Sequence, residues 1–189
     1  MCNVIPVSHA STLLDVGCGN GHFLSHFAER CNATGIDSSA LMLSTNPSAR
    51  TLLMQAEKMD FPDGAFDISF CHALLHHVHD PAAVLAEMKR VSSRYVVVLE
   101  PTRNNPLMFL FALFVKEERK ALRFSAKYLK ELAGQQHLKI IDIFAFGLMV
   151  PNKTPLWALH FFRFFERRIP GGITLILIAE KNDGHGEGN

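Results

Sequence analysis

The chain has 189 residues, which corresponds to one domain with some elaboration at about 150 residues per domain. Its 19 basic and 18 acidic side chains nearly balance, which argues against a nucleic-acid binder that relies on a global positive field. Apolar residues make up 48% of the chain, so a mostly disordered protein is excluded. The longest apolar run, 106–115, is about half of the roughly 20 residues that a spanning helix needs. Since no secretory signal opens the chain and the four cysteines lack C-x-x-C spacing, we expect a cytoplasmic, soluble protein.

Short apolar runs alternate with amphipathic stretches along the chain, a pattern typical of an α/β fold with a mostly parallel sheet. Strands are predicted at 12–16, 33–37, 51–55, 66–71, 94–100, 139–144 and 173–181, and helices at 21–31, 39–46, 81–91 and 125–136. Two segments rich in Phe and Leu, 102–124 and 147–172, interrupt this rhythm. We therefore expect a single domain over residues 1–181 with two insertions, followed by a disordered tail at 182–189.

A glycine-rich loop follows the first predicted strand and carries most of the functional information. The run Leu13-Leu-Asp-Val-Gly-Cys-Gly-Asn-Gly21 places glycines at three alternate positions between a strand and a helix. Glycine lets the backbone turn tightly and leaves room for a ligand across the strand ends, and the following helix N-terminus offers free N–H groups. An acidic residue, Asp37, ends the second strand, 22 residues after Asp15. There it can accept hydrogen bonds from both hydroxyls of a ribose.

Two ligand classes compete for such a loop. A dinucleotide fingerprint would require a glycine at position 22, but that residue is His22. The carboxylate of Asp15, two residues before the first glycine, suits a cationic or zwitterionic ligand better than a pyrophosphate. No Gly-Lys-Ser/Thr follows the loop, which excludes a P-loop.

These motifs resemble the class I S-adenosylmethionine-dependent methyltransferases, especially the small enzymes of ubiquinone and menaquinone biosynthesis. The matching residues are Leu14-Asp-Val-Gly-Cys-Gly-Asn-Gly21, Gly35-Ile-Asp-Ser-Ser39, Gln55-Ala-Glu57 and Phe66-Asp-Ile-Ser-Phe-Cys-His-Ala-Leu-Leu-His-His77. The resemblance implies a Rossmann-like, seven-stranded sheet whose antiparallel last strand lies between the fifth and the sixth. It also implies S-adenosyl-L-methionine as the cofactor.

The resemblance assigns the cofactor contacts along the chain. The loop residues Asp15, Gly17, Cys18, Gly19, Asn20 and Gly21 would lie beside the methionine moiety, Asp37 and Ser38 at the ribose, Ala56 and Glu57 at the adenine, and Cys71 and His72 near the methionine end. Cys18 itself is interpreted as a small packing residue rather than a nucleophile.

The chain departs from the family pattern at two places. Family members usually carry an N-terminal helix that covers the cofactor, whereas eleven residues precede the first predicted strand here. The glycine-rich turn before the fifth strand is replaced by Val91-Ser-Ser-Arg94. We therefore expect an open cofactor site, or one closed by a partner or a second copy. A catalytically inactive, cofactor-binding regulatory or scaffolding module remains the alternative to an enzyme.

Four histidines, His72, His76, His77 and His79, follow the fourth strand. His76 or His77 is a candidate general base for a hydroxyl or protonated amine acceptor, although we favour the simpler interpretation that they cap the next helix and pack the loop. A metal site on His72 and His76 is discounted because no H-E-x-x-H arrangement occurs. Glu100, at the end of the fifth strand, would either meet the acceptor or cap the next segment.

The acceptor is expected to be small and hydrophobic, with methylation at O, C or N. The segments 107–115 and 156–165 are too apolar for bare surface loops, so they would roof a lipophilic pocket, contact a membrane surface or pack on the sheet. Lys116, Lys120, Arg123 and Lys127 follow at helical spacing, as suits an anionic head group. Nucleic acid is not expected, since the fourth strand ends in Phe-Cys-His rather than in a motif of the nucleic-acid-methylating enzymes.

Overall fold

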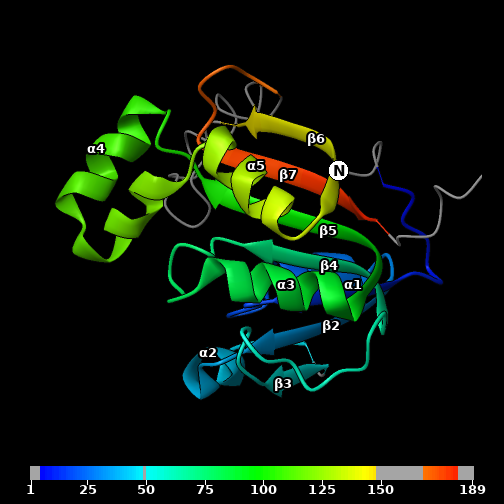
Figure 1. The fold of residues 1–189 in the computed structure, drawn as a ribbon. Coiled ribbons are helices and arrows are strands. Elements are labelled where there is room, and N and C mark those ends of the chain that lie inside the picture. Colours follow the sequence, from blue (N-terminus) through cyan, green and yellow to red (C-terminus); the bar gives the residue numbers. More distant parts are fainter. Residues whose placement is uncertain (1–4, 49, 148–167, 183–189) are drawn as a thin grey trace, which may run out of the picture.

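A computed structural model describes residues 5–48, 50–147 and 168–182, and a seven-stranded sheet forms its centre (Figure 1). The strands are β1 (Thr12–Val16), β2 (Asn32–Asp37), β3 (Thr51–Leu53), β4 (Phe66–His72), β5 (Ser92–Pro101), β6 (Leu138–Phe146) and β7 (Thr174–Lys181). The helices are α1 (His22–Ala28), α2 (Ala40–Ser44), α3 (Pro81–Val91), α4 (Pro106–Phe114) and α5 (Ala126–Gln135), with a 3₁₀ helix η1 at Lys116–Arg123.

The strand order is β3-β2-β1-β4-β5-β7-β6. Strands β1 to β5 pair in parallel, and β7 runs antiparallel to both of its neighbours, β5 and β6. The predicted fold class is therefore confirmed, including the insertion of the last strand between the fifth and the sixth. The order reverses beside β1, and ligands of open α/β sheets bind at the carboxyl ends of the strands at such a point.

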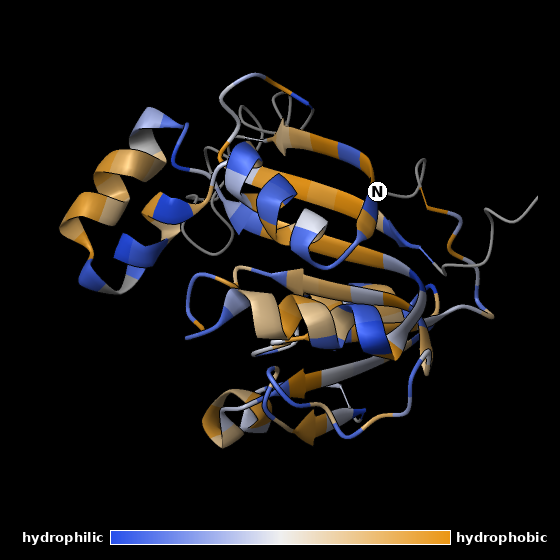
Figure 2. Ribbon diagram, viewed as in Figure 1, coloured by the Kyte–Doolittle hydropathy of each residue, from blue (hydrophilic) through white to orange (hydrophobic). Residues whose placement is uncertain are grey.

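Alternating side chains of the strands build an apolar layer on each face of the sheet. In β1, Leu14 packs into a cluster with Val84 of α3 and Leu129 of α5. Its neighbour Leu13 packs into a second cluster with Leu24 of α1. Figure 2 shows the apolar strands between these helices. The two buried layers fix the sheet and leave the strand ends available for binding.

The helix boundaries follow local capping. Asp80 accepts hydrogen bonds from Ala82 N and Ala83 N, and Pro81 occupies the first helical turn of α3, as predicted. Ser125 caps α5 by accepting from Tyr128 N. This cap separates Lys127 from η1, so the four cations do not share one helix as their spacing had suggested.

The first insertion, 102–124, contains α4 and η1 and stands off from the sheet at the left of Figure 1. Of the second insertion, positions 148–167 lie outside the described residues, as does the predicted tail beyond Asn182. In the described part of the chain, no helix is long and apolar enough to cross a membrane.

Candidate functional site

The loop between β1 and α1 has the backbone conformation that its glycines allow. Gly17, Gly19 and Gly21 have φ values of 73°, 50° and 84°, in the left-handed region that side chains rarely adopt. A Cβ on Gly17 would lie 2.8 Å from Leu74 Cδ1. The N–H groups of Gly17 and Cys18 donate to Ile36 O at 2.8 and 2.9 Å, which ties the loop to the end of β2.

Asp37 holds this loop and faces the same cleft. Its Oδ2 accepts a hydrogen bond from Gly19 N at 2.9 Å, and its Oδ1 accepts one from Ser39 N at 2.8 Å. The side chain is only half-buried and lines a cavity. Because each carboxylate oxygen can accept more than one hydrogen bond, Asp37 keeps capacity for the hydroxyls of a ligand.

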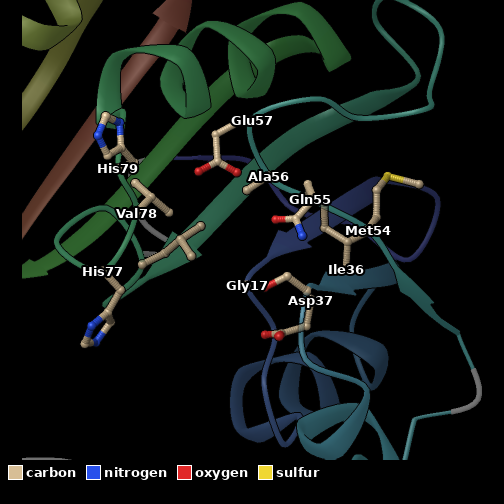
Figure 3. A pocket seen from close by; sticks show the side chains of 12 residues that line it. Gly17, Ile36, Asp37, Met54, Gln55, Ala56, Glu57, His77, Val78 and His79 are labelled. Atoms are coloured by element: carbon tan, nitrogen blue, oxygen red, sulfur yellow. The ribbon is translucent and has the colours of Figure 1, made fainter. Parts of the chain in front are cut away.

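The cavity beside Asp37 has a volume of about 310 Å³, within the range of small-molecule sites. Its lining residues come from the ends of β1 and β2 and from the loops after β3 and β4: Gly17, Ile36, Asp37, Ser38, Met54, Gln55, Ala56, Glu57, Leu74, His77, Val78 and His79. Figure 3 shows Asp37 beside Gly17 at one end, and Glu57, Val78 and His79 toward the other. The cavity thus has an acid toward each end, Asp37 at the end of β2 and Glu57 in the loop after β3.

A smaller hollow of about 160 Å³ adjoins this cavity at Gly17. Its lining comprises Asp15, Gly17, Cys18, Gly19, Asn20, His22, Phe23 and His72. Asp15 is 2% exposed, and its Oδ2 has no hydrogen-bond partner among the described residues. Burial, together with the charge of Asp37, raises the pKa of Asp15 to about 7. A cationic group in this hollow would compensate the buried carboxylate.

Glu100, by contrast, is fully buried beneath the loop that follows β4. Its Oε1 accepts from Leu74 N at 3.0 Å and Leu75 N at 2.7 Å, and its Oε2 lies 2.6 Å from His76 Nδ1. These three contacts hold the loop whose next residue, His77, lines the large cavity. The geometry favours a positioning role for Glu100 over contact with an acceptor.

His76 and His77 differ in exposure although they are adjacent. His76 is 2% exposed, whereas the exposed His77 borders the large cavity. Although the side chain reaches solvent, partial desolvation of its ring and the neighbouring His76 lower the pKa of His77, which favours the neutral imidazole at neutral pH. Asp80 caps α3, so the interpretation of these two histidines as helix caps is wrong.

The described residues also gather a donor set that the sequence did not suggest. Ligand atoms of His76, His77 and Glu118 lie within 4.8 Å of one another, and His76 Nε2 is 3.3 Å from Glu118 Oε2. Glu118 belongs to η1, far from the histidines in sequence. The predicted pair His72 and His76 is not part of this set, because His72 lines the hollow beside Asp15.

The remaining predicted contacts divide into lining and interior residues. Asn20, Ser38, Ala56 and Glu57 line the two hollows, whereas Cys71 is fully buried in the core on the α3 side of the sheet. Cys18 Sγ packs where a Cβ on Gly35 would lie, and burial with nearby acids raises the pKa of Cys18 to about 12, as suits a packing residue.

Sequence reasoning missed Asn46 and Gln55. Asn46 Nδ2 donates to Gly19 O at 3.0 Å and so braces the glycine loop from the end of α2. Gln55 lines the large cavity. Gln55 stood in a quoted motif and could have been found there, whereas Asn46 follows α2 without any motif of its own.

Comparisons with known proteins agree with this geometry. Residues 14–95 match the family model described as a methyltransferase domain. The ubiquinone biosynthesis O-methyltransferase of Pseudomonas paraeruginosa is 34% identical over 118 residues, covering 56% of this chain and 50% of that protein. The trans-aconitate 2-methyltransferase of Azoarcus sp. is 35% identical over 95 residues, covering 46% of this chain and 36% of that protein. The chain thus spans about half the length of the ubiquinone-biosynthesis relative.

Solved structures give the same fold. A methyltransferase dependent on S-adenosylmethionine from Thermotoga maritima superimposes with a TM-score of 0.75 at 17% identity, over 95% of this chain and 84% of that one. A second such enzyme, from Archaeoglobus fulgidus, gives 0.71 at 17% identity, over 93% and 88%.

Residues 14–95 therefore match a methyltransferase domain, and the resemblance to the class I methyltransferases inferred from the motifs is confirmed by this match and by the fold. The cofactor of this class is S-adenosyl-L-methionine. The described residues fit this cofactor in two respects. Asp15 Oδ2 is buried without a hydrogen-bond partner among them, so it can face a positive charge. The neighbouring loop has no side chain at Gly17, where a Cβ would lie 2.8 Å from Leu74 Cδ1.

Proposed function

We propose that the protein transfers the methyl group of S-adenosyl-L-methionine to a small, hydrophobic acceptor at O, C or N. The proposal rests on one observation: the two hollows meet at Gly17, with Asp37 lining the larger and the buried Asp15 lining the smaller. When bound, the cofactor supplies an electrophilic methyl group on a sulfonium. Asp37 would accept hydrogen bonds from the ribose hydroxyls, and Asp15 would compensate positive charge at the methionine end.

Ala56, Glu57 and Ser38 complete the proposed nucleoside side of the site. Ala56 lies nearly buried at the cavity wall, where its small apolar side chain leaves room for a base, and Glu57 stands half-buried beside it. Gly17, Cys18, Gly19 and Asn20, with His72, would surround the methionine end, and Gly21 follows in the same loop without lining either hollow. Cys71 would contribute packing beneath His72 rather than contact, because its side chain is fully buried.

We assign the general base to His77 and a positioning role to His76 and Glu100. His77 borders the cavity with a lowered pKa, so a neutral imidazole is available to remove a proton from an acceptor hydroxyl or amine. Glu100 fixes His76 and the backbone of Leu74 and Leu75, and thereby the place of His77. Such alignment matters because an in-line displacement gains much of its rate from the positions of the reacting groups.

Support for a hydrophobic acceptor comes from the apolar helix α4 and from the ubiquinone biosynthesis O-methyltransferase relative. The first test is calorimetric titration with S-adenosylhomocysteine. Asp37→Ala should weaken binding by about 1.5–3 kcal/mol through lost charge-assisted hydrogen bonds. The control, Asp60→Ala, removes an exposed acid outside the cavity lining and should bind normally.

The second test is methyl transfer from labelled cofactor to a panel of phenolic quinone precursors and carboxylic acids. Transfer to the phenols supports the proposal, and transfer only to polar acids overturns the acceptor class. Tight binding without transfer to any member would favour the inactive module instead. Unchanged affinity in Asp37→Ala would overturn the ribose assignment.

A further inference from the structure

The helix α4 combines two properties that rarely occur together. Its nine residues, Pro106–Phe114, carry no charge and no side-chain polarity on any face. A helix that is apolar all round is normally buried in a large core or in lipid. Here Ala112 is buried, but Phe109, Leu110, Leu113 and Phe114 are 42%, 51%, 43% and 85% exposed.

These four side chains form one continuous strip. Their spacing of i, i+1, i+4 and i+5 places them on the same side of a helix, while Ala112 and Phe111 turn inward. Four of the nine exposed large apolar side chains in the described part of the chain lie on this one helix. Such a concentration marks an interaction surface rather than scattered exposure.

A segment of net positive charge adjoins the strip. Its sequence, Lys116-Glu-Glu-Arg-Lys-Ala-Leu-Arg123, holds four cations and two acids. The helix η1 begins two residues after α4 and presents four exposed cations, Lys116, Arg119, Lys120 and Arg123. Among the described residues, no carboxylate forms an ion pair with any of the four. Figure 2 shows the apolar α4 and the hydrophilic η1 side by side on the arm that stands off from the sheet.

From this arrangement we propose that α4 and η1 form a docking surface for an anionic lipid bilayer. The apolar strip enters the boundary between head groups and acyl chains, and the cations of η1 meet the anionic head groups. A nine-residue helix is too short to span a bilayer, so it lies on the surface. A second copy packed on the same strip would bring two sets of these cations together, which disfavours self-association.

The docking surface is connected to the cleft by direct contacts. Lys120 Nζ lies 3.5 Å from His77 O and 3.4 Å from Val78 O, and Glu118 reaches His76. Between η1 and this loop lies a hollow of about 200 Å³ that shares Val78 and His79 with the large cavity. If the proposed function holds, a lipophilic acceptor would pass from the bilayer to His77 through the hollow between η1 and the loop after β4. The docking itself does not depend on methyl transfer.

Co-sedimentation of the full chain with vesicles tests the proposal. We expect binding to phosphatidylcholine vesicles that contain phosphatidylglycerol and much weaker binding to phosphatidylcholine alone. The double variant Leu110→Ser/Phe114→Ser should lower the affinity about tenfold or more, because membrane binding scales with buried apolar area. Lys116→Gln/Arg119→Gln should lower it about fivefold per removed charge on anionic vesicles only, and added salt should have a similar effect.

The matched control is Leu53→Ser/Ile141→Ser, which removes two exposed apolar side chains from the edge strands β3 and β6 and should leave vesicle binding unchanged. Equal loss in this control would overturn the proposal, as would absence of binding to anionic vesicles.

Sedimentation velocity and thermal melts of the same variants identify the other occupants. A dimer that Leu110→Ser/Phe114→Ser dissociates assigns the strip to a second copy, and lost stability without vesicle binding assigns it to packing within the chain. Cofactor binding, measured separately, tests the proposed function independently.

Discussion

Asp37 and Glu100 are both acids at the carboxyl ends of parallel strands, yet their surroundings are opposite. Asp37, at the end of β2, is half-buried, lines the large cavity and accepts one backbone hydrogen bond on each oxygen. Glu100, near the end of β5, is fully buried and accepts two backbone hydrogen bonds besides its contact with His76. An acid at a strand end therefore binds a ligand or fixes a loop according to how many of its lone pairs the protein already occupies.

The same contrast separates the two sides of the cleft. On the side of β1 and β2, the buried Asp15 has an oxygen without a partner among the described residues, which leaves room for a ligand. On the side of β4 and β5, the protein engages Glu100 and the Nδ1 of His76, His76 Nε2 lies 3.3 Å from Glu118 Oε2 without a hydrogen bond, and the exposed His77 borders the cavity. The first side is suited to binding, and the second is suited to placing one imidazole.

The largest expected effect is that of replacing His77, the imidazole that the side of β4 and β5 would position. His77→Ala should lower kcat about 10²- to 10⁴-fold, as expected for loss of a general base, with little change in KM for the cofactor. Steady-state kinetics with the best acceptor from the panel measures both values. His79→Ala, a second exposed histidine of the same cavity, is the control and should lose less than His77→Ala. Equal losses would show that neither imidazole has a specific role.

Glu100→Ala tests whether the buried acid fixes the loop. We expect a loss of about 3–5 kcal/mol in the free energy of unfolding, because removing one partner of a buried pair leaves the others unsatisfied. Urea denaturation measures it. Glu118→Ala removes the partly exposed carboxylate on the other side of His76 and should cost less than about 1 kcal/mol. Unchanged stability with lost turnover would instead place Glu100 at the acceptor.

The fold could be predicted from the sequence because each strand is short, apolar and bounded by turns. Strand β5 carries the run Val96–Glu100, which is buried on both faces, as a central strand requires. The glycine loop and Asp37 were recognisable because glycine spacing and a strand-end acid are local features. Neither needs knowledge of distant contacts.

The roles of Glu100 and His76 could not be predicted from local features of the sequence. Their contact joins residues 24 positions apart, and its burial depends on how the loop after β4 folds back over β5. Glu118 approaches His76 from η1 across an even longer separation. The sequence gives the residue types, and only the folded chain shows which of their atoms are already occupied.

A smaller effect comes from the glycine loop. Gly17→Ala places a Cβ at φ 73°, and we expect a cost of about 1–2 kcal/mol in stability together with weaker binding of S-adenosylhomocysteine. Gly64→Ala has a similar φ of 67°, outside both hollows, so it is a matched control for backbone strain. Gly64→Ala should keep its affinity and lose somewhat less stability, because its Cβ would meet nothing closer than 3.6 Å whereas that of Gly17→Ala would lie 2.8 Å from Leu74 Cδ1. If both variants bind alike, the loop does not approach the ligand closely.

The last comparison is a pH dependence that belongs to Asp15. Burial raises its pKa from 3.8 to about 7 in the folded protein, so between these values the native state holds a proton that the unfolded chain has released. Stability without ligand should therefore fall as the pH rises through this window. Asp15→Asn, which stays neutral, should remove this slope and melt at a higher temperature than the wild type at pH 8.

Cofactor binding should show the opposite trend. A cationic ligand favours the ionised carboxylate, so affinity for S-adenosyl-L-methionine should rise with pH and level off above about 7. Below that value it should fall by no more than about tenfold per pH unit, the limit for one proton. Calorimetry in buffers of different ionisation enthalpy measures the proton released on binding. A pH slope that persists in Asp15→Asn would assign the proton to another group and separate Asp15 from the binding side of the cleft.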